Sequence, residues 1–595
     1  MVYIDPYMRT RMAQPLRVGS PWVSFGPGAP GDVVRWPVVF RLAGAAAVPR
    51  IPGLRVHAKL GPIVAGDVTE AALSTLAVAP GVLVLEMSRP GGTRDGGPGA
   101  AAPMLGTLAE NADATALHAA GELGAHAIVA VIDAGLDLRH EAFLDAAGGT
   151  RVLAFWDQTD RAGTSPAAQG VGSLTFGSLY LKPDIQRQLQ LHAVPATLVR
   201  DPQGHGTHVT SIAAGSATQN SPGGVAPAAG IVFVRPDLMA KPGAPPSIGY
   251  SLGHIAALEF IRTFAELQGL PVVVNVSLGM NAGAHDGTTL LEAAFDAFCE
   301  GGHAPGRVVV KSAGNEHNKR GHAQAQIPAF GALAIEFTVP RNYTDQAYLE
   351  AWFDSRADLA FTLIDPSGNR SGAADRAARH AQGSVGGASY VLDVEPFHPD
   401  NGDGRLVIEL APANPLGVLP DGLWQLEVVS LKASGTEMID LWIERLDTMP
   451  DLQFGGQHAP NGTLSIPGTA RTVITVGALK TAAPLLALTA TSSHGLTRDR
   501  RAKPDLIAPG GDILAAEATT LDRYCTKSGT SMAAPHVAGG LALILSHFQR
   551  LGLPLPCAAQ LRGAVVHGAA MPQAQHHPGF GHGVFSADGA LKALS

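Results

Sequence analysis

The chain has 595 residues, too many for one ordinary domain, and 46% of them are hydrophobic against 15% charged, the balance of a folded globular protein. The formal net charge of −8 is small for this length and no lysine or arginine run stands out, which excludes a nucleic acid or an acidic membrane surface as the expected partner. Three widely spaced cysteines, Cys299, Cys525 and Cys557, exclude a disulfide framework and a structural zinc site.

The N-terminal residues predict neither a signal segment nor a fold of their own. The opening sequence MVYIDPYMRTRMAQPLRVG lacks an apolar core, and we expect no later stretch to reach the length of a membrane span. A cytoplasmic location is therefore expected, with export by another route left open. Residues 1–37 are rich in Pro, Gly and Arg without periodicity, which predicts an irregular arm.

Residues 38–89 are expected to form a small α+β module. The segments VVFRLA, LRVHAKL and GVLVLEMS have the pattern of strands. DVTEAALSTLA has the pattern of a helix, with Asp67 as the predicted N-cap and Glu70 completing a capping box. The sequence that follows is rich in Gly, Pro and Ala, so residues 90–105 are predicted to be an exposed linker of the kind that proteases cut.

Residues 106–320 alternate short apolar strands with amphipathic helices. The strands include AIVAVID, IVFVR, VVVNVSL and VVVKSAGN, and the helices include IAALEFIRTFAEL and LLEAAFDAF. This alternation predicts an α/β domain with a buried parallel sheet and helices on both faces. The same rhythm resumes at RTVITVGAL, so residues 456–595 are expected to complete the domain.

Residues 321–455 have a different pattern. Short alternating strands such as ALAIEFTVP, LAFTLIDPSGN and LWQLEVVS are separated by Gly, Pro, Asn and Asp. This is typical of an antiparallel β-sandwich, and we predict one inserted into the α/β domain, with Trp424 in its core.

Three polar residues lie where an open α/β sheet holds its active site, past the carboxyl ends of strands or at helix starts. Asp133 ends the strand AIVAVID, His205 lies in GHGTHVTSIAAG, and Ser531 begins a helix in SGTSMAAPHVAGG. A serine becomes a nucleophile when a histidine takes its proton and a carboxylate orients that histidine. Asn315, at the end of VVVKSAGN, supplies an amide donor for the developing oxyanion.

Each of these residues has a simpler reading when it is taken alone. Ser528, Thr530 or Ser531 would serve as a helix cap, Asp133 as a turn former and His205 as a structural histidine. Their occurrence together and in this chain order favours the catalytic reading. His208, one helical turn after His205, is expected to be structural.

The order and local sequences resemble the subtilisin-like serine proteases, the subtilase family or peptidase family S8. AVIDAGLDLRHEAF, GHGTHVTSIAAG and SGTSMAAPHVAGG are similar to that family's aspartate, histidine and serine motifs, and NVSLG and KSAGN to its substrate cleft and oxyanion asparagine. The resemblance implies that Asp133 orients the base His205, that Ser531 attacks and that Asn315 stabilises the oxyanion. It also implies two sets of substrate-binding residues: Ser277, Leu278 and Gly279, which would pair with substrate backbone, and Ser312, Ala313 and Gly314, which would line the primary specificity pocket.

The chain departs from the family pattern in two places. The family usually has Thr or Ser after the catalytic aspartate, whereas this chain has Ala134, so one hydroxyl contact to the carboxylate is expected to be missing. The insertion, together with RVLAFWDQT, resembles a bacterial subset of subtilases that carries a jelly-roll-like domain, as in clostridial spore-germination proteases. Residues 38–89 lie where the family keeps a ferredoxin-like propeptide, which implies an intramolecular inhibitor.

The expected function is therefore that of a serine endopeptidase that acts on proteins or peptides and is made as a self-inhibited precursor. The alternative is a pseudoprotease or regulatory binding protein with an occluded cleft. An α/β-hydrolase esterase is disfavoured because its triad follows the chain order Ser, Asp, His, whereas the candidate residues here follow the order Asp, His, Ser. No cofactor and no metal site are expected. Structural calcium is left open without a nameable ligand set, and DNGDGR (400–405) is predicted to be a β-turn because it lacks the closing glutamate of a calcium loop.

Overall fold

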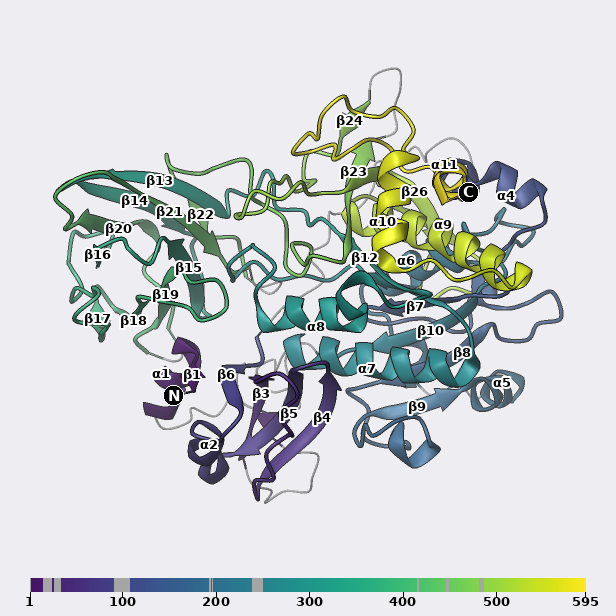
Figure 1. Ribbon diagram of the computed structural model, residues 1–595, viewed down its shortest axis with the longest axis horizontal. Coiled ribbons are helices and arrows are strands. Elements are labelled where there is room, and N and C mark those ends of the chain that lie inside the picture. The colour runs from purple at the N-terminus through teal and green to yellow at the C-terminus, as the bar shows by residue number, and fades with distance from the viewer. Residues whose placement is uncertain are drawn as a thin grey trace.

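A computed structural model describes residues 2–13, 24–25, 34–89, 107–191, 194, 196–237, 250–414, 417–445, 449–480 and 486–594. Figure 1 shows three parts, namely a small N-terminal module, a β-sandwich and a larger α/β domain. The predicted linker at 90–105 lies outside the described residues.

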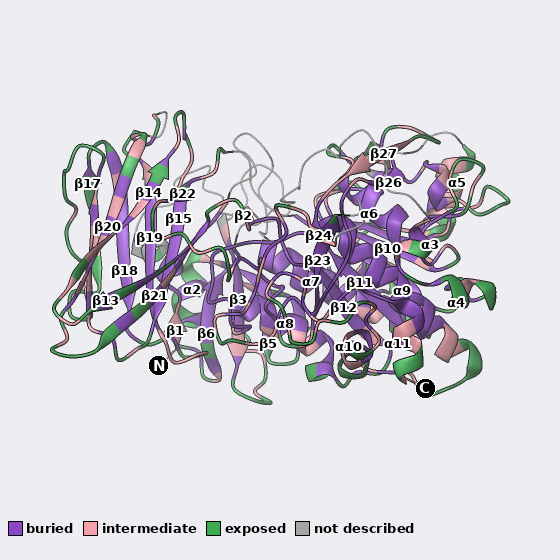
Figure 2. Ribbon diagram, turned by 90° about the horizontal axis from the view of Figure 1, so that it is seen from above, coloured by how far each residue is buried: buried purple, intermediate pink, exposed green. Residues whose placement is uncertain are grey.

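The α/β domain is built on one sheet in the order β24-β23-β12-β11-β7-β10-β8-β9, with β25 beside β23. Its strands are parallel except for β9 and β24. β7 and β11 are buried at every residue because both faces of the sheet are covered (Figure 2). The strands of this domain are β7 (Ile128–Ile132), β8 (Val152–Asp157), β9 (Ser178–Leu181), β10 (Gly230–Arg235), β11 (Val272–Val276), β12 (Arg307–Ser312), β23 (Ile474–Lys480), β24 (Ala487–Leu488) and β25 (Leu506–Pro509), with β26 (Ile513–Ala516) and β27 (Tyr524–Lys527) as a separate pair.

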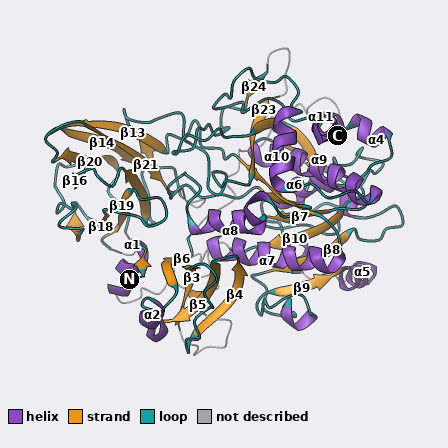
Figure 3. Cartoon of the chain, viewed as in Figure 1, coloured by secondary structure: helices purple, strands orange, loops and turns teal. Residues whose placement is uncertain are grey.

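Helices cover both faces of this sheet, as predicted (Figure 3). α6 and α9 pack against each other on one face, and α7 and α8 lie on the opposite face. The helices of the domain are α3 (Leu108–Asn111), α4 (Thr115–Ala119), α5 (Lys182–Gln190), α6 (His205–Ala214), α7 (Tyr250–Gln268), α8 (Leu290–Phe298), α9 (Thr530–Leu551), α10 (Ala558–His567) and α11 (Ala587–Leu594). Within the described residues, short 3-10 turns accompany them at Glu141–Phe143, Ala167–Gln169, Ala196–Val199 and Glu300–Gly302.

α9 corrects one expectation. By length and composition this helix is long and apolar enough to cross a membrane, whereas no such stretch was expected, and 89% of its most apolar window is buried inside the protein. It contacts β11, β12 and β23, so its apolar length follows from packing across the middle of the sheet.

The N-terminal module is an antiparallel sheet with strand order β6-β3-β5-β4 and β1 parallel to β6 at the edge. This is the strand order of a β-α-β-β-α-β unit in which residues 43–53 connect the first two strands without a helix. One face packs on α7 and α8, and α2 covers the other. The elements are β1 (Tyr3–Ile4), α1 (Pro6–Ala13), β2 (Ser24–Phe25), β3 (Val34–Leu42), β4 (Leu54–Leu60), β5 (Ile63–Thr69), α2 (Glu70–Leu76) and β6 (Val82–Met87).

Two predictions for the N-terminal residues are wrong. The arm at 1–37 is not irregular throughout, because it contains β1 and α1 and buries Tyr7 and Met8. The N-cap of α2 is Thr69, whose hydroxyl accepts from the Ala72 amide at 3.3 Å, and not Asp67. Asp67 lies within β5, where its carboxylate pairs with basic groups on the neighbouring strands β3 and β4.

Two antiparallel sheets form the insertion, in the orders β13-β21-β15-β19-β18-β17 and β16-β20-β14-β22. Their inner faces share one core that includes Trp424, whose indole donates to the Pro420 carbonyl at 2.9 Å. The strands are β13 (His322–Pro328), β14 (Ala332–Val339), β15 (Ala347–Phe353), β16 (Leu359–Ile364), β17 (His380–Val385), β18 (Ala388–Glu395), β19 (Gly404–Pro412), β20 (Gly422–Ser430), β21 (Thr436–Ile443) and β22 (Gln453–Phe454).

Buried charges join the insertion to the N-terminal residues. Arg405 is fully buried and donates to Asp5 at 2.8 Å and to Glu350 at 2.7 Å, and Arg89 also reaches Glu350 at 3.2 Å. Burial alone would raise the pKa of Glu350, but the guanidinium groups of Arg405 and Arg89 hold it below its usual value. The Arg405 guanidinium also lies 5.4 Å from the ring centre of Tyr7.

We expect Arg405→Met to destabilise the protein by about 3–5 kcal/mol, because it leaves Asp5 and Glu350 buried with less compensation. Urea denaturation followed by tryptophan fluorescence measures this loss. The matched control is Arg370→Met, which removes a half-exposed ion pair to Glu427 and should cost less than about 1 kcal/mol. Equal losses in the two variants would contradict the role given to Arg405.

Candidate active site

Asp133 and His205 form a buried hydrogen-bonded pair. His205 Nδ1 lies 2.7 Å from Asp133 Oδ1, and the two side chains are 1% and 0% exposed. Asp133 directly follows β7, and His205 is the first residue of α6. The approach of α6 requires Gly206, because a Cβ there would lie 2.1 Å from the Gly135 carbonyl oxygen and 3.0 Å from the Asp133 Cβ.

The carboxylate of Asp133 is only partly satisfied. Its Oδ1 accepts from His205 and from the Ala134 amide at 2.8 Å, whereas the buried Oδ2 has no hydrogen-bond partner among the described residues. This is the consequence expected of Ala134, which offers no side-chain donor. The Asp133 carboxylate is therefore held on one oxygen only.

Ser531 lies in the first turn of α9, and its hydroxyl does not cap the helix. The N-cap is Gly529, at φ +148° and ψ 168°, a conformation that favours glycine. The capping roles considered for Ser528, Thr530 and Ser531 are therefore wrong. The Thr530 amide instead donates to Asn315 Oδ1 at 3.1 Å.

Pro535 loosens the first turn of α9 at the carbonyl of Ser531. A residue at position 535 would normally donate its amide to that carbonyl, and proline has no amide hydrogen. Ser277 replaces the missing donor, because its Oγ lies 3.2 Å from the Ser531 carbonyl oxygen. Ser277 had been expected only to pair with substrate backbone, so this buried side-chain role is one that the sequence motif did not reveal.

Asn315 follows β12 and is almost fully buried. Its Oδ1 accepts from both the amide and the hydroxyl of Thr530, at 3.1 and 3.3 Å. Because the oxygen makes these contacts, the NH₂ group of the amide takes no part in the bonds to Thr530. This fixes the orientation of the donor that the sequence assigned to the oxyanion.

The two predicted binding segments follow neighbouring parallel strands. Residues 277–279 come after β11, and residues 312–314 lie at the end of β12. Ser465 and Ile466 bridge them, since the Ser465 amide donates to the Ala313 carbonyl at 2.8 Å and the Ile466 amide donates to the Met280 carbonyl at 2.8 Å. The strands that precede Leu278 and Ala313 are thus neighbours, and Ser465 and Ile466 link the two segments at their ends.

His208 has the structural role expected of it. Its Nε2 lies 3.1 Å from the Ile513 carbonyl oxygen and 3.0 Å from that of Cys525, which ties α6 to the β26–β27 pair. Burial lowers the pKa of His208 to about 3, so the ring is neutral at pH 7.

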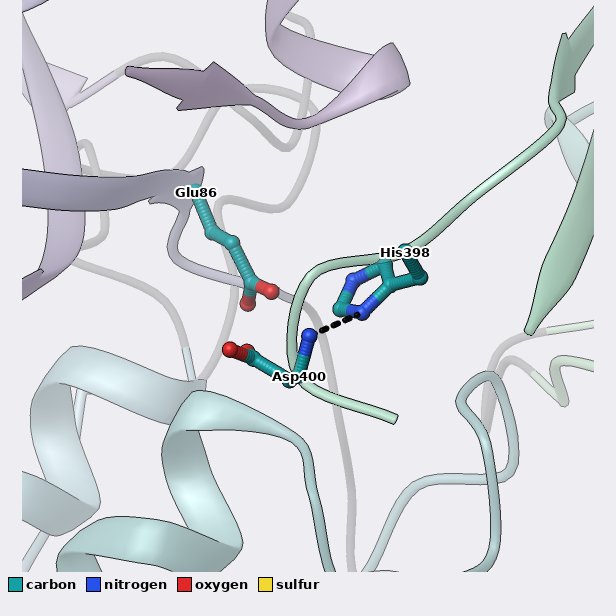
Figure 4. Close-up of side chains that lie close together, drawn as sticks. All are labelled: Glu86, His398 and Asp400. Atoms are coloured by element: carbon teal, nitrogen blue, oxygen red, sulfur yellow. Dashed lines mark hydrogen bonds between the residues drawn. The ribbon is translucent and has the colours of Figure 1, made fainter. Parts of the chain in front are cut away.

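Glu86, His398 and Asp400 form a compact group of potential metal ligands where the module meets the insertion (Figure 4). Two cations already lie there, since Arg41 pairs with Asp400 and Arg89 lies 3.9 Å from Glu86. These charges disfavour a metal ion. Residues 399–401 form a turn, but the Gly402 amide donates to the His398 carbonyl four residues earlier, at 2.8 Å, so the turn is one residue wider than the β-turn predicted for DNGDGR.

Comparison with known proteins gives a consistent result. The peptidase S8 subtilase family model matches residues 124–344 and 455–583, more than half of the chain, and the interruption falls in the insertion. Among solved structures, the CspB protease of Clostridium perfringens has a TM-score of 0.70 and 26% sequence identity, covering 82% of this chain and 96% of that one.

Two curated relatives are more distant or match over a shorter stretch. A C5a peptidase of Streptococcus pyogenes serotype M6 is 24% identical over 461 residues, which cover 72% of this chain but only 35% of that protein. An intracellular serine protease of Paenibacillus polymyxa is 62% identical over 40 residues, 7% of this chain and 12% of that protein. The family match in both halves of the α/β domain, together with the structural likeness to CspB, shows that this chain belongs to the subtilase family.

Proposed function

We propose that the protein is a serine endopeptidase that uses Asp133, His205 and Ser531 as a catalytic triad. The observation that carries this proposal is the buried 2.7 Å bond between His205 Nδ1 and Asp133, in a chain whose α9 begins with a serine hydroxyl that is not used as a cap. Family membership supports protein or peptide substrates.

The proposed reaction follows from the tautomer of His205. Because Nδ1 donates its hydrogen to Asp133, Nε2 is the basic nitrogen and takes the proton from Ser531 Oγ. Oγ then bonds to the scissile carbonyl carbon, and the Asn315 amide stabilises the oxyanion. His205 returns the proton to the leaving amine, which breaks the peptide bond and leaves an acyl-enzyme. Water, activated by the same nitrogen, hydrolyses that ester.

Ser531→Ala should abolish labelling by a fluorophosphonate probe and all peptidase activity, because the attacking oxygen is lost. Intact mass of the purified protein also reports whether the chain cuts itself between about residues 89 and 105, and the variant should remain uncut. Ser528→Ala is the matched control, since it removes a hydroxyl three residues away that bonds only to Asp512 in the described structure. Undiminished labelling of Ser531→Ala would overturn the triad.

Asn315→Leu should lower kcat by about 100- to 1,000-fold and change KM by only a few-fold, since an oxyanion donor acts mainly on the transition state. Steady-state kinetics on one peptide substrate separates the two constants. Thr530→Val is the control for the lost contact between Asn315 and α9. A rise in KM at unchanged kcat would instead make Asn315 a ground-state binding residue.

We further propose that the N-terminal module acts as an intramolecular inhibitor in a precursor. The last residues of the module, Ser88 and Arg89, accept hydrogen bonds from the first turn of α7. The Tyr250 amide donates to the Arg89 carbonyl at 2.8 Å, and the Leu252 amide donates to Ser88 Oγ at 2.9 Å. The module sheet also packs on α7 and α8. The buried ion pairs around Arg405 would hold the module after a cut in the linker.

The pH should govern how firmly the module is held. Burial raises the pKa of Glu86 from 4.5 to about 7, and the neighbouring Arg89 only partly opposes this. A raised pKa means that the docked state favours the protonated form of Glu86. The contribution of Glu86 to the stability of the docked module is therefore complete below pH 4.5 and is lost as the pH rises through about 7. The effect has an upper size of about 3 kcal/mol.

The module should therefore leave a linker-cleaved protein more readily at pH 8 than at pH 5.5, as measured by size-exclusion chromatography. Glu86→Gln stays neutral and should retain the module equally at both values. Glu70→Gln, an exposed change on α2, is the control. A pH effect that persists in Glu86→Gln would assign it to other groups.

A further inference from the structure

Two neighbouring residues of the insertion bond to the chain just beyond both predicted binding segments. Glu444 and Arg445 directly follow β21. Glu444 is buried, and the side chain of Arg445 is 15% exposed. Their side chains bond to residues 281–282 and to Glu316, which follow β11 and β12 of the α/β domain.

Glu444 holds the segment that continues from β11. Its carboxylate accepts from the Asn281 amide at 2.8 Å and from the Ala282 amide at 2.7 Å. The negative charge strengthens both bonds, and two amides on one carboxylate fix the position and the direction of that backbone. Asn281 is two residues after Gly279, so Glu444 supports the backbone that would pair with substrate.

Arg445 holds the segment that continues from β12. Its Nη1 lies 2.7 and 2.8 Å from the two carboxylate oxygens of Glu316. Its Nε donates to Asp451 at 2.6 Å, so the planar guanidinium group is fixed between two carboxylates. Glu316 directly follows Asn315, the proposed oxyanion donor. The ion pair therefore anchors the residue next to that donor to the insertion.

One side chain joins the two anchored positions. Asn281 Nδ2 lies 3.3 Å from Glu316 Oε2 and 3.3 Å from the Ile443 carbonyl oxygen. Ile443 is the last residue of β21, so the continuations of both binding segments meet the insertion at the end of one strand. A movement of that strand end would displace both continuations together.

Small displacements matter here because an oxyanion donor acts only when it reaches the developing charge, and an error of about 1 Å costs about 100-fold in rate. Ser493 also supports the backbone around Asn315. Its Oγ accepts from the Glu316 amide at 3.0 Å, and its amide donates to the Gly314 carbonyl at 2.9 Å. Loss of Arg445 should therefore shift Asn315 without releasing it.

We propose that Glu444 and Arg445 are positioning residues for catalysis, and that through them the insertion sets the geometry of the active site. Arg445 acts on the oxyanion donor Asn315, and Glu444 acts on the substrate segment 277–279. This inference rests on the proposed endopeptidase function.

The two residues should have different kinetic signatures, although they are neighbours in the chain. Arg445→Met should lower kcat by about 10- to 100-fold and change KM by less than about 3-fold, because an oxyanion donor acts in the transition state. Glu444→Leu should raise KM by about 10-fold with a smaller effect on kcat, because substrate backbone is bound less well in the ground state. Steady-state kinetics on one peptide substrate measures both constants.

Conservative variants and matched controls separate positioning from a loss of stability. Arg445→Lys keeps the charge and should restore part of kcat, and Glu444→Gln keeps an acceptor oxygen and should restore part of the affinity for substrate. The controls are Arg370→Met and Glu427→Leu, which remove the two partners of an ion pair at the other sheet of the insertion. Both controls should leave kcat and KM unchanged.

A double-mutant cycle tests the link between Arg445 and Asn315. In an Asn315→Leu background the donor is already absent, so Arg445→Met should lower kcat by less than about 2-fold. Losses that multiply fully in the double variant, or an unchanged kcat in Arg445→Met alone, would overturn the proposal. If Arg445→Met does not fold, Arg445→Lys takes its place in the same cycle.

Labelling and binding separate this proposal from the proposed function. A wild-type protein that neither cleaves peptides nor reacts with a fluorophosphonate probe rejects the endopeptidase. Fluorescence anisotropy of fluorescein-labelled β-casein with Ser531→Ala measures the substrate segment without chemistry, and adding Glu444→Leu should weaken binding by about 10-fold. Equal binding with and without Glu444→Leu overturns the role of Glu444. Cleavage by the wild type, together with losses that multiply in the cycle, keeps the endopeptidase and rejects this inference.

Discussion

The side chain of Asn315 joins the end of β12 to the beginning of α9, and the proposed chemistry depends on this contact. α9 starts at Gly529 without a side-chain cap of its own, so its first amide is satisfied by Asn315 Oδ1 at 3.1 Å. The same bond directs the amide NH₂ of Asn315 and positions the turn that holds Ser531. The side chain of Asn315 thus fixes both the position of the first turn of α9 and the orientation of the oxyanion donor. A shift of one therefore moves the other.

The sequence predicted most of the α/β domain because the hydrophobic patterns of its strands and helices can be recognised within short segments. Uniformly apolar strands such as Val272–Val276 and the helices between them are typical of a sheet covered on both faces, and the structure has this arrangement. The pairing of Asp133 with His205 was also predictable, because glycines at 204 and 206 permit a helix to begin against a strand end. Trp424 lies in the sandwich core for the same local reason, an alternating strand pattern.

What the sequence did not predict depends on distant contacts. Residues 2–13 were expected to be irregular because they lack periodicity, but Asp5 and Tyr7 are ordered by Arg405 of the insertion. The first turn of α9 could not be derived either, since Ser277 and Asn315 complete it from two separate strands. The hydrogen bond from Lys311 to Ser465 Oγ at 3.2 Å could not be derived either, because Ser465 follows the insertion in the chain.

The contact between Arg405 and Asp5 spans 400 residues of sequence. Bringing such distant positions together is slow, since the entropy of closing a long loop is spent before the contact forms. During synthesis β1 can pair with β6 once the module has been made, but Asp5 cannot meet Arg405 until the sandwich has been made and folded. The buried ion pair between Asp5 and Arg405 therefore forms late, after the insertion has folded. A chain with a misfolded sandwich would lack this ion pair, so its N-terminal module would be held less firmly than in the folded protein.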